Sequence, residues 1–282
     1  MQVTSDQKSF FEKNGYLIID NFYSKTELND FTLAYADIIR STVERIYSET
    51  AKRITVPQEL GAIFDQTLFE IESVDHKYVA QIYDTTAQIP EFLRIISKKE
   101  TSDVINGLLE KESSNPLYTY TCRCRIDMPS DTRRTYGWHQ EVFYTIPKSN
   151  FLQTWAPLIR NTTIQNGTIE VCPGSQKEGI ADQSWNEIPG RATQIIVEDR
   201  LVEKYPQISC EMQLGQLLIF SSRLFHRSGQ NSSKETRFSL VGMYHDISNP
   251  TFYAPEIAFK HGVSPREFYE EVFTAQKLTK SV

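Results

Sequence analysis

The sequence predicts a mainly β protein with flanking helices, and three observations support this prediction. Through the first 115 residues the apolar side chains recur mostly at helical spacing. After Asn115-Pro116, short runs rich in Tyr, Thr, Val and Ile alternate with turn residues, which is typical of a sandwich or a barrel. No internal repeat or linker interrupts the 282 residues, so we expect one domain over 1–282.

Helix signals dominate the segment 1–115. A short helix is expected over 6–14, ended by Gly15, because glycine readily adopts the left-handed conformation at a helix end. A strand is expected over 16–20. Ser24 and Glu27 have the spacing of a capping box at the start of a long amphipathic helix running to about Tyr47. Further helices are expected from 66 to about 112, one of them starting at Pro90. We expect this helical front to pack on the sheet and to supply lid elements.

The segment 116–250 is expected to form the β core. Strand patterns occur at 117–126, 151–157, 167–172, 194–197, 214–220 and 237–245. In the last segment, 251–282, Pro265 follows Ser264 in the first turn of a predicted helix.

Composition excludes several classes of protein without selecting a function. Thirty Lys and Arg against 36 Asp and Glu give a net charge of −6, which argues against a nucleic-acid partner. No apolar run reaches the roughly 18 residues of a membrane span. The first residues lack a basic segment followed by an apolar one, so a cytoplasmic protein is expected. Four cysteines are too few for a disulfide framework.

The most informative stretch is Trp138-His139-Gln140-Glu141. If it is a strand, His139 and Glu141 point to the same side. His226 follows the apolar strand pattern ending at Phe220, and a barrel rim could bring it back to that pair. Two neutral imidazoles and one carboxylate can bind one face of an octahedral Fe(II) ion and leave three positions open, as in the facial triad of non-haem iron oxygenases. A His-x-Glu pattern alone often arises by chance, so the hypothesis depends on the third ligand.

Arg237 adds a second feature. It lies 11 residues after His226, and strand alternation places Ser239 on the same side. A buried guanidinium can bind a carboxylate through two parallel hydrogen bonds, with a hydroxyl as a further donor. The pattern suits a dicarboxylate cosubstrate, although Ser239 could instead bond to the sheet edge.

In several places the chain resembles the phytanoyl-CoA dioxygenase family of Fe(II)/2-oxoglutarate oxygenases. The matching stretches, in family order, are 10–20, 138–141, 166–177 and 226–231 followed by Arg237. The resemblance implies a double-stranded β-helix core (a jelly roll, cupin-like). It also implies Fe(II) on His139, Glu141 and His226, 2-oxoglutarate on Arg237, and O₂ as the oxidant. Trp155 and Cys124 stand where the family has neighbours of the cosubstrate, although Trp155 could be ordinary core.

Two departures from the family pattern stand out. Glu141 replaces the more usual Asp, and Gln176 stands where His usually follows Pro-Gly-Ser. A carboxylate at position 141 argues against halogenation, because related halogenases have a small residue there. The activity implied is hydroxylation of an unactivated C–H bond of a small metabolite, with release of succinate and CO₂. The alternatives are desaturation, epimerisation or demethylation by the same chemistry, or a non-catalytic β-helix domain that binds a ligand or a partner.

Candidate substrate residues surround the motif. Arg123 and Arg125 share one side of a predicted strand, and Arg134 lies on the loop before the motif, so an anionic substrate group is possible; surface ion pairs are the alternative. Tyr136 and Phe143 flank the motif, as does Tyr144, and could form an aromatic wall. The remaining histidines, His76, His245 and His261, are interpreted as structural or surface residues, although His245 could face the cavity.

Overall fold

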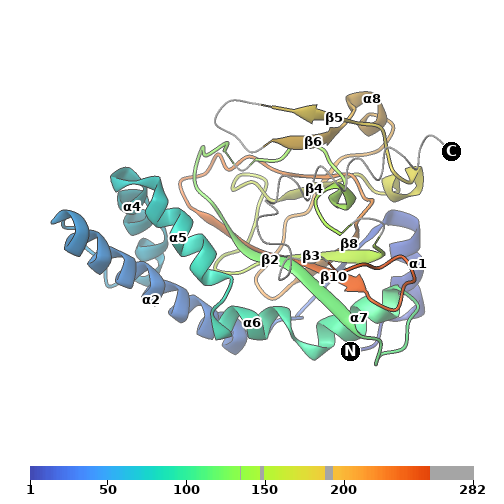
Figure 1. Ribbon diagram of the computed structural model, residues 1–282, viewed down its shortest axis with the longest axis horizontal. Coiled ribbons are helices and arrows are strands. Elements are labelled where there is room, and N and C mark those ends of the chain that lie inside the picture. The colour runs from blue at the N-terminus through green and yellow to red at the C-terminus, as the bar shows by residue number, and fades with distance from the viewer. Residues whose placement is uncertain (134, 147–148, 188–192, 255–282) are drawn as a thin grey trace.

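The computed structural model describes residues 1–133, 135–146, 149–187 and 193–254. Most helices of the first 115 residues lie along one side of the largest sheet, and the smaller strands lie on its other side (Figure 1). The helical segments are α1 (Ser5–Asn14), α2 (Lys25–Thr50), α3 (Leu60–Ala62), the π-helical turn η1 (Ile63–Thr67), α4 (Leu68–Val74), α5 (His76–Thr86), α6 (Pro90–Ile96) and α7 (Lys99–Leu108).

The helix ends confirm the local signals in the sequence. Gly15 follows α1 with φ at 80°, where only glycine is free of steric cost. The Ser24 side chain accepts a hydrogen bond from the Glu27 backbone, and the Glu27 carboxylate accepts one from the Ser24 backbone, so the predicted capping box forms. The helix α2 continues three residues beyond the predicted end, to Thr50. Pro90 begins α6 as expected.

The strands form three sheets. The five-stranded sheet has the order β1-β8-β3-β10-β2, a second sheet has the order β7-β4-β9, and β5 pairs with β6. Their bounds are β1 (Tyr16–Ile19), β2 (Leu117–Asp127), β3 (Phe151–Pro157), β4 (Ile169–Val171), β5 (Gln183–Asn186), β6 (Gln194–Val197), β7 (Ile208–Ser209), β8 (Leu217–Ser221), β9 (His226–Ser228) and β10 (Arg237–Asp246). All pairings within these sheets are antiparallel.

Most predicted strands are confirmed, and one is wrong. Residues 138–141 do not form a strand: His139 makes an isolated bridge, and Glu141 begins the 3-10 turn η2 (Glu141–Phe143). The short strands β5, β7 and β9 were not predicted, because two to four residues carry too little periodicity. The predicted helix at Ser264 lies outside the described residues, as do Arg134 and His261.

Both faces of the large sheet are covered. On one face, Tyr35 of α2 and Phe64 of η1 pack edge-on against Phe238 of β10, with ring centroids 5.3 and 5.6 Å away. On the other face, Trp155 of β3 belongs to the same buried cluster as Ile169 of β4, so apolar side chains connect the two sheets there. The helical front and the β core therefore share one hydrophobic core on one face of the large sheet, and the second sheet packs on the other face.

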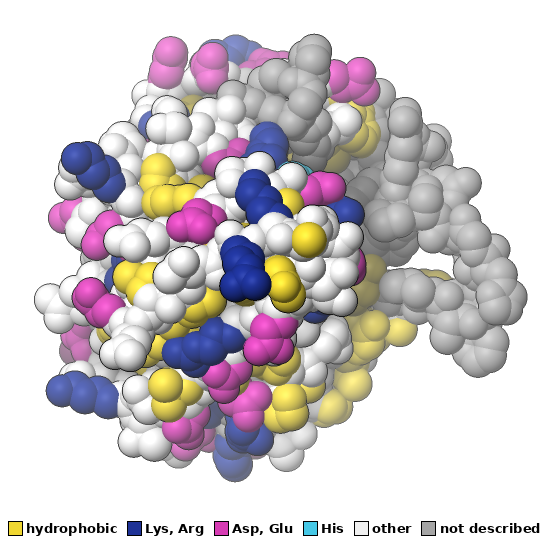
Figure 2. Space-filling view, turned by 90° about the vertical axis from the view of Figure 1, so that its left-hand side faces the viewer, with side chains coloured by type: hydrophobic (Ala, Val, Ile, Leu, Met, Phe, Trp, Pro, Cys, Tyr) yellow, Lys and Arg dark blue, Asp and Glu magenta, His cyan; other side chains and the backbone are white. Residues whose placement is uncertain are grey.

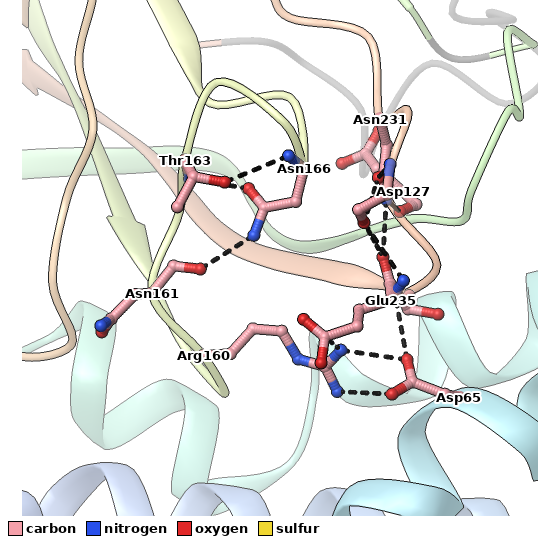
Figure 3. A network of polar contacts seen from close by, with 10 residues as sticks. Asp65, Asp127, Arg160, Asn161, Thr163, Asn166, Asn231 and Glu235 are labelled. Atoms are coloured by element: carbon pink, nitrogen blue, oxygen red, sulfur yellow. Dashed lines mark hydrogen bonds and ion pairs between the residues drawn. The ribbon is translucent and has the colours of Figure 1, made fainter.

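A polar network ties the helices to the ends of β2 and β10 (Figure 3). Asp65 of η1 binds the Arg160 guanidinium through two contacts of 3.1 and 3.0 Å and accepts a hydrogen bond from the Thr236 backbone at 2.7 Å. The Asn231 amide donates to the carbonyl oxygens of Asp127 and Glu235, each at 2.8 Å. These contacts hold the last residue of β2 close to the first residue of β10.

On the face shown in Figure 2, Lys and Arg side chains are interspersed with Asp and Glu, so this face carries no broad patch of one sign. Within the described ranges, no helix combines the length and the apolar character needed to cross a bilayer.

Candidate metal centre

Three side chains predicted as ligands converge at one point between the two sheets. His139, Glu141 and His226 are buried, and one ligand atom of each lies within 4.8 Å of the other two. The Glu141 Oε2 atom is 3.7 Å from the His139 Nε2 and 3.4 Å from the His226 Nε2. Two nitrogens and one oxygen at this spacing fit a single divalent ion that binds all three.

Backbone contacts orient both imidazoles. His139 and His226 face each other across an isolated bridge, with N···O hydrogen bonds of 3.0 and 3.1 Å. The Nδ1 atom of His139 is 2.7 Å from the Gly137 carbonyl oxygen, and that of His226 is 2.9 Å from the Leu224 carbonyl oxygen. A carbonyl only accepts, so each Nδ1 carries the hydrogen and donates it. Each Nε2 therefore presents a lone pair to the centre, as a metal ligand must.

Glu141 reaches the centre although its backbone is not in a strand. The chain turns into η2 directly after Gln140, whose side chain is fully buried between the two ligand residues. Its amide nitrogen donates to the carbonyls of Gly179 at 2.8 Å and Arg223 at 2.6 Å, and its oxygen accepts from the Ala181 backbone at 3.0 Å. With the backbone held in this way, the glutamate carboxylate arrives next to both imidazoles.

The electrostatics of the three groups favour metal binding. Burial alone would raise the pKa of Glu141, but at low pH, where the imidazoles of His139 and His226 are protonated, their contacts with the carboxylate outweigh burial and lower its pKa to about 2. Burial and the neighbouring His139 lower the pKa of His226 below its ordinary value of 6.5. Near neutral pH the carboxylate is therefore ionised and His226 is neutral, which are the protonation states that bind metal.

The three ligand residues lie in the wall of a cavity of about 370 Å³. Four of the other candidate residues also line it: Arg123, Arg125, Tyr136 and Trp155. Tyr144 lines it as well, and Tyr136 and Tyr144 both contact the His139 ring, with centroid distances of 5.5 and 5.4 Å. The predicted aromatic wall is thus formed by two tyrosines.

Among the described residues, three other candidates do not line the cavity. Phe143 and Cys124 are buried in hydrophobic clusters, and Cys124 lies on the opposite side of β2 from Arg123 and Arg125. Arg134 is outside the described residues. His245 is buried between Phe151 and two hydroxyl groups, those of Thr145 and Ser149, and does not line the cavity.

Arg237 and Ser239 lie behind the cavity wall. Arg237 is 2 % exposed and binds Asp127 at 2.8 Å, while Arg125, which does line the cavity, binds the other oxygen of Asp127 at 3.0 Å. The Arg237 Nε and the Ser239 Oγ are buried without a hydrogen-bond partner. Two unpaired donors beside a pair of guanidinium groups fit a carboxylate ligand such as one end of 2-oxoglutarate.

Several cavity residues were missed by the sequence analysis. Gln153 and Ser228 could have been found, because each lies two residues from a candidate on a predicted strand or strand end, Trp155 and His226. Tyr83 gave no signal, since it comes from α5, far away in sequence. Arg227 also lines the cavity, paired with Glu170 at 2.7 Å.

The comparisons with known proteins agree with this geometry. The model of the family "Phytanoyl-CoA dioxygenase (PhyH)" matches residues 11–239, which is more than half of the chain. A probable phytanoyl-CoA dioxygenase of Caenorhabditis elegans is 24% identical over 86% of this chain and 75% of its own length. Among solved structures, EctD from S. alaskensis with 2-oxoglutarate and 5-hydroxyectoine is 18% identical, with a TM-score of 0.59 over 88% of this chain and 77% of that one. The epimerase SnoN with Fe³⁺ and alpha ketoglutarate is 17% identical, with a TM-score of 0.56 over 92% and 91% of the two chains.

These matches show a double-stranded β-helix core with helices around it. The predicted fold is therefore confirmed, and so is the non-haem iron triad of His139, Glu141 and His226 as a feature of this chain. The chain belongs to the phytanoyl-CoA dioxygenase (PhyH) family of non-haem iron, 2-oxoglutarate-dependent oxygenases.

Proposed function

We propose that this oxygenase hydroxylates an unactivated C–H bond of a small metabolite, with release of succinate and CO₂. The observation that carries the proposal is the convergence of two imidazole Nε2 atoms and one carboxylate in the wall of a cavity of about 370 Å³. His139, Glu141 and His226 would hold Fe(II). When bound, the iron and 2-oxoglutarate supply the oxidising chemistry, using O₂.

For the cosubstrate we propose Arg237 and Ser239 as anchors. The unpaired Nε and Oγ atoms support this assignment, because a carboxylate would satisfy both buried donors. Arg125 lines the cavity and contacts the same Asp127 carboxylate as Arg237, so it would supply a second guanidinium near the cosubstrate. Trp155 lines the cavity on the neighbouring strand β3 and would pack against the bound cosubstrate.

The remaining groups would position the substrate and exclude water. Tyr136 and Tyr144 cover the His139 ring from the cavity side and would limit access of bulk water to the centre. Helix α5 contributes Tyr83 to the wall, in keeping with the expected contribution of the helical front to the substrate site. We further propose that the substrate is a small molecule, that the protein acts in the cytoplasm, and that it has no nucleic-acid or membrane partner.

Anaerobic titration with Fe(II) and then 2-oxoglutarate tests the centre. Chelation of the iron by the cosubstrate is expected to produce a weak visible charge-transfer band, and exposure to O₂ should then yield succinate. His226→Ala should lose both, since only two ligands remain. His76→Ala is the matched control, because His76 is exposed and bound to Glu72 outside the cavity. A wild-type protein with no band and no succinate would refute the proposal and favour a non-catalytic binding domain.

Product mass separates the possible outcomes once a substrate is found. Hydroxylation adds one oxygen atom, desaturation removes two hydrogens, epimerisation leaves the mass unchanged, and demethylation removes a CH₂ unit from the product. A gain of one oxygen is the expected result. Any of the other three changes would contradict hydroxylation while leaving the iron centre in place.

A further inference from the structure

One cation in the cavity wall differs from the others. Arg123 lies on β2, an edge strand of the large sheet, and its guanidinium stands 5.9 Å from the centre of the Tyr83 ring. Arg125 is paired with Asp127, and Arg227 with Glu170. Arg123 forms no ion pair with any described residue. An unpaired guanidinium next to an aromatic ring is a group that can bind an anion from solution.

When the charges of the iron, the cosubstrate and the cavity residues are added, one positive charge remains uncompensated. A divalent ion with Glu141 carries one net positive charge, the cluster of Arg125, Asp127 and Arg237 carries a second, and Arg123 carries a third. A 2-oxoglutarate dianion neutralises two of the three. Of the two arginines on β2, Arg123 lies further from Asp127. It is therefore the group to which the cosubstrate provides no counter-charge.

The backbone of β2 is shaped to bring Arg123 into the cavity. Val241 of β10 pairs with Arg123, but Met243, two residues on, pairs with Tyr120, so β2 contains one extra residue at this point. Thr121, inside this bulge, has φ at 54°, which is rare for a β-branched residue and costs about 1–3 kcal/mol. Strained backbone of this kind is kept where the surrounding structure requires it.

The bulge changes which side chains of β2 face the cavity. Before it, Tyr118 and Tyr120 share the side of Met243 and His245, their partners on β10. After it, the residues on that side are the odd-numbered ones, and Thr121, Arg123 and Arg125 line the cavity. Without the extra residue, the even-numbered alternation would continue and both arginines would point to the opposite face.

The cavity also offers a neutral polar contact. Gln153 of β3 lies in the wall, is 4 % exposed, and its Oε1 atom has no hydrogen-bond partner. A buried amide oxygen without a donor is costly unless a ligand supplies one. The volume of about 370 Å³ is at the lower end of the range of ~300–1,000 Å³ typical of ligand sites, which favours a small polar substrate.

We infer that the substrate of this cavity carries an anionic oxygen group, a carboxylate or a phosphate, that is bound by Arg123 beside Tyr83. This inference rests on the proposed function, because the anionic group would hold the substrate at one end while a C–H bond lies at the metal centre. The role of Arg123 is to position the substrate, and it takes no part in binding iron.

Three probes of equal chain length test the inference: hexanoate, hexyl phosphate and the neutral hexanamide. Each is titrated calorimetrically into anaerobic protein loaded with Fe(II) and 2-oxoglutarate. Two variants accompany the wild type. Arg123→Gln removes the charge at the cavity, and Arg53→Gln removes a similar charge elsewhere, since Arg53 is exposed and stacks on the Tyr47 ring at 5.2 Å. The visible band of the iron–cosubstrate complex is recorded for every protein.

The expected result is that at least one anionic probe binds about tenfold more tightly than hexanamide to the wild type, which corresponds to one charge-assisted contact. Arg123→Gln should abolish this preference and keep the visible band, and Arg53→Gln should keep both. Whether hexanoate or hexyl phosphate binds better identifies the anionic group. Equal binding of all three probes to the wild type, or a preference that survives in Arg123→Gln, would overturn the inference. Loss of the band in the wild type would instead count against the proposed function itself.

Discussion

Replacing Asp127 by asparagine would remove the negative charge that lies between two guanidinium groups. Asp127 is buried and contacts Arg125 at 3.0 Å and Arg237 at 2.8 Å. Removing one partner of a buried ion pair typically costs about 3–5 kcal/mol, because the remaining charge is left uncompensated. Arg125 lines the cavity and can be solvated there, so we expect a loss near the lower end of this range.

The pKa of Asp127 provides an independent magnitude. Burial would raise it, but Arg125 and Arg237 lower it to about 2, from an ordinary value of 3.8. The unfolded chain binds the proton more readily, so the stability from this group is present above about pH 4 and is lost as the pH falls through about 2. A difference of nearly two pKa units corresponds to roughly 2 kcal/mol. Both routes predict that Asp127→Asn lowers the free energy of unfolding by about 2–3 kcal/mol.

Urea denaturation at pH 7 measures this loss. Asp182→Asn is the control, because Asp182 pairs with Arg200 at 3.4 Å on the surface, where such a pair contributes less than about 1 kcal/mol. Asp127→Glu keeps the charge and should retain more stability than Asp127→Asn, which keeps the test informative if the asparagine variant folds poorly. If Asp127→Asn and Asp182→Asn lower the free energy of unfolding equally, the reasoning about the buried charge cluster is refuted.

Three further predictions concern other parts of the molecule. Burial lowers the pKa of His245 from 6.5 to about 4, so the free energy of unfolding should fall by up to about 3 kcal/mol as the pH drops from 6.5 to 4. The fall should be smaller in His245→Gln. Parallel curves of unfolding free energy against pH for the two proteins would contradict this prediction. In thermal denaturation, Gly167→Ala should be more destabilising than Gly179→Ala by at least about 1 kcal/mol. Both glycines have positive φ, but a Cβ at Gly167 would lie 2.5 Å from the Gly229 carbonyl oxygen, whereas nothing lies within 4 Å of a Cβ at Gly179. Equal losses of stability would show that this steric contact is unimportant. Gln140→Leu should weaken iron binding by about 10–100-fold, measured by anaerobic titration, since the residue holds the backbone between two ligands; unchanged affinity would rule out this positioning role.

The sequence was most informative where a signal is local. The capping box at Ser24 and the strand β3 depend on residues close together in the chain, and both are confirmed. The pairing of His139 with Glu141 was also predictable, although the strand that was meant to align them is absent and a 3-10 turn does so instead. In each case the side chains concerned are separated by only a few residues.

The rest depended on contacts distant in sequence. That Asp127 binds Arg237 follows from the register of β2 against β10, which no short pattern reveals. Tyr83 reaches the cavity only because helix α5 packs near β2. The departure from the family's usual aspartate at position 141 also needed the structure, which shows that the longer glutamate side chain still reaches both imidazoles.

The extra residue in β2 has a consequence for how such a site can change in evolution. A substitution alters one side chain at a time, but deletion of a single residue near Thr121 would move every side chain on one part of the strand to the opposite face of the sheet. Arg123 and Arg125 would leave the cavity together, and residues such as Cys122 and Cys124 would take their places. One deletion could thus turn a cationic wall into an apolar one while leaving His139, Glu141 and His226 untouched, so a family with one iron chemistry could reach substrates of opposite polarity in a single step.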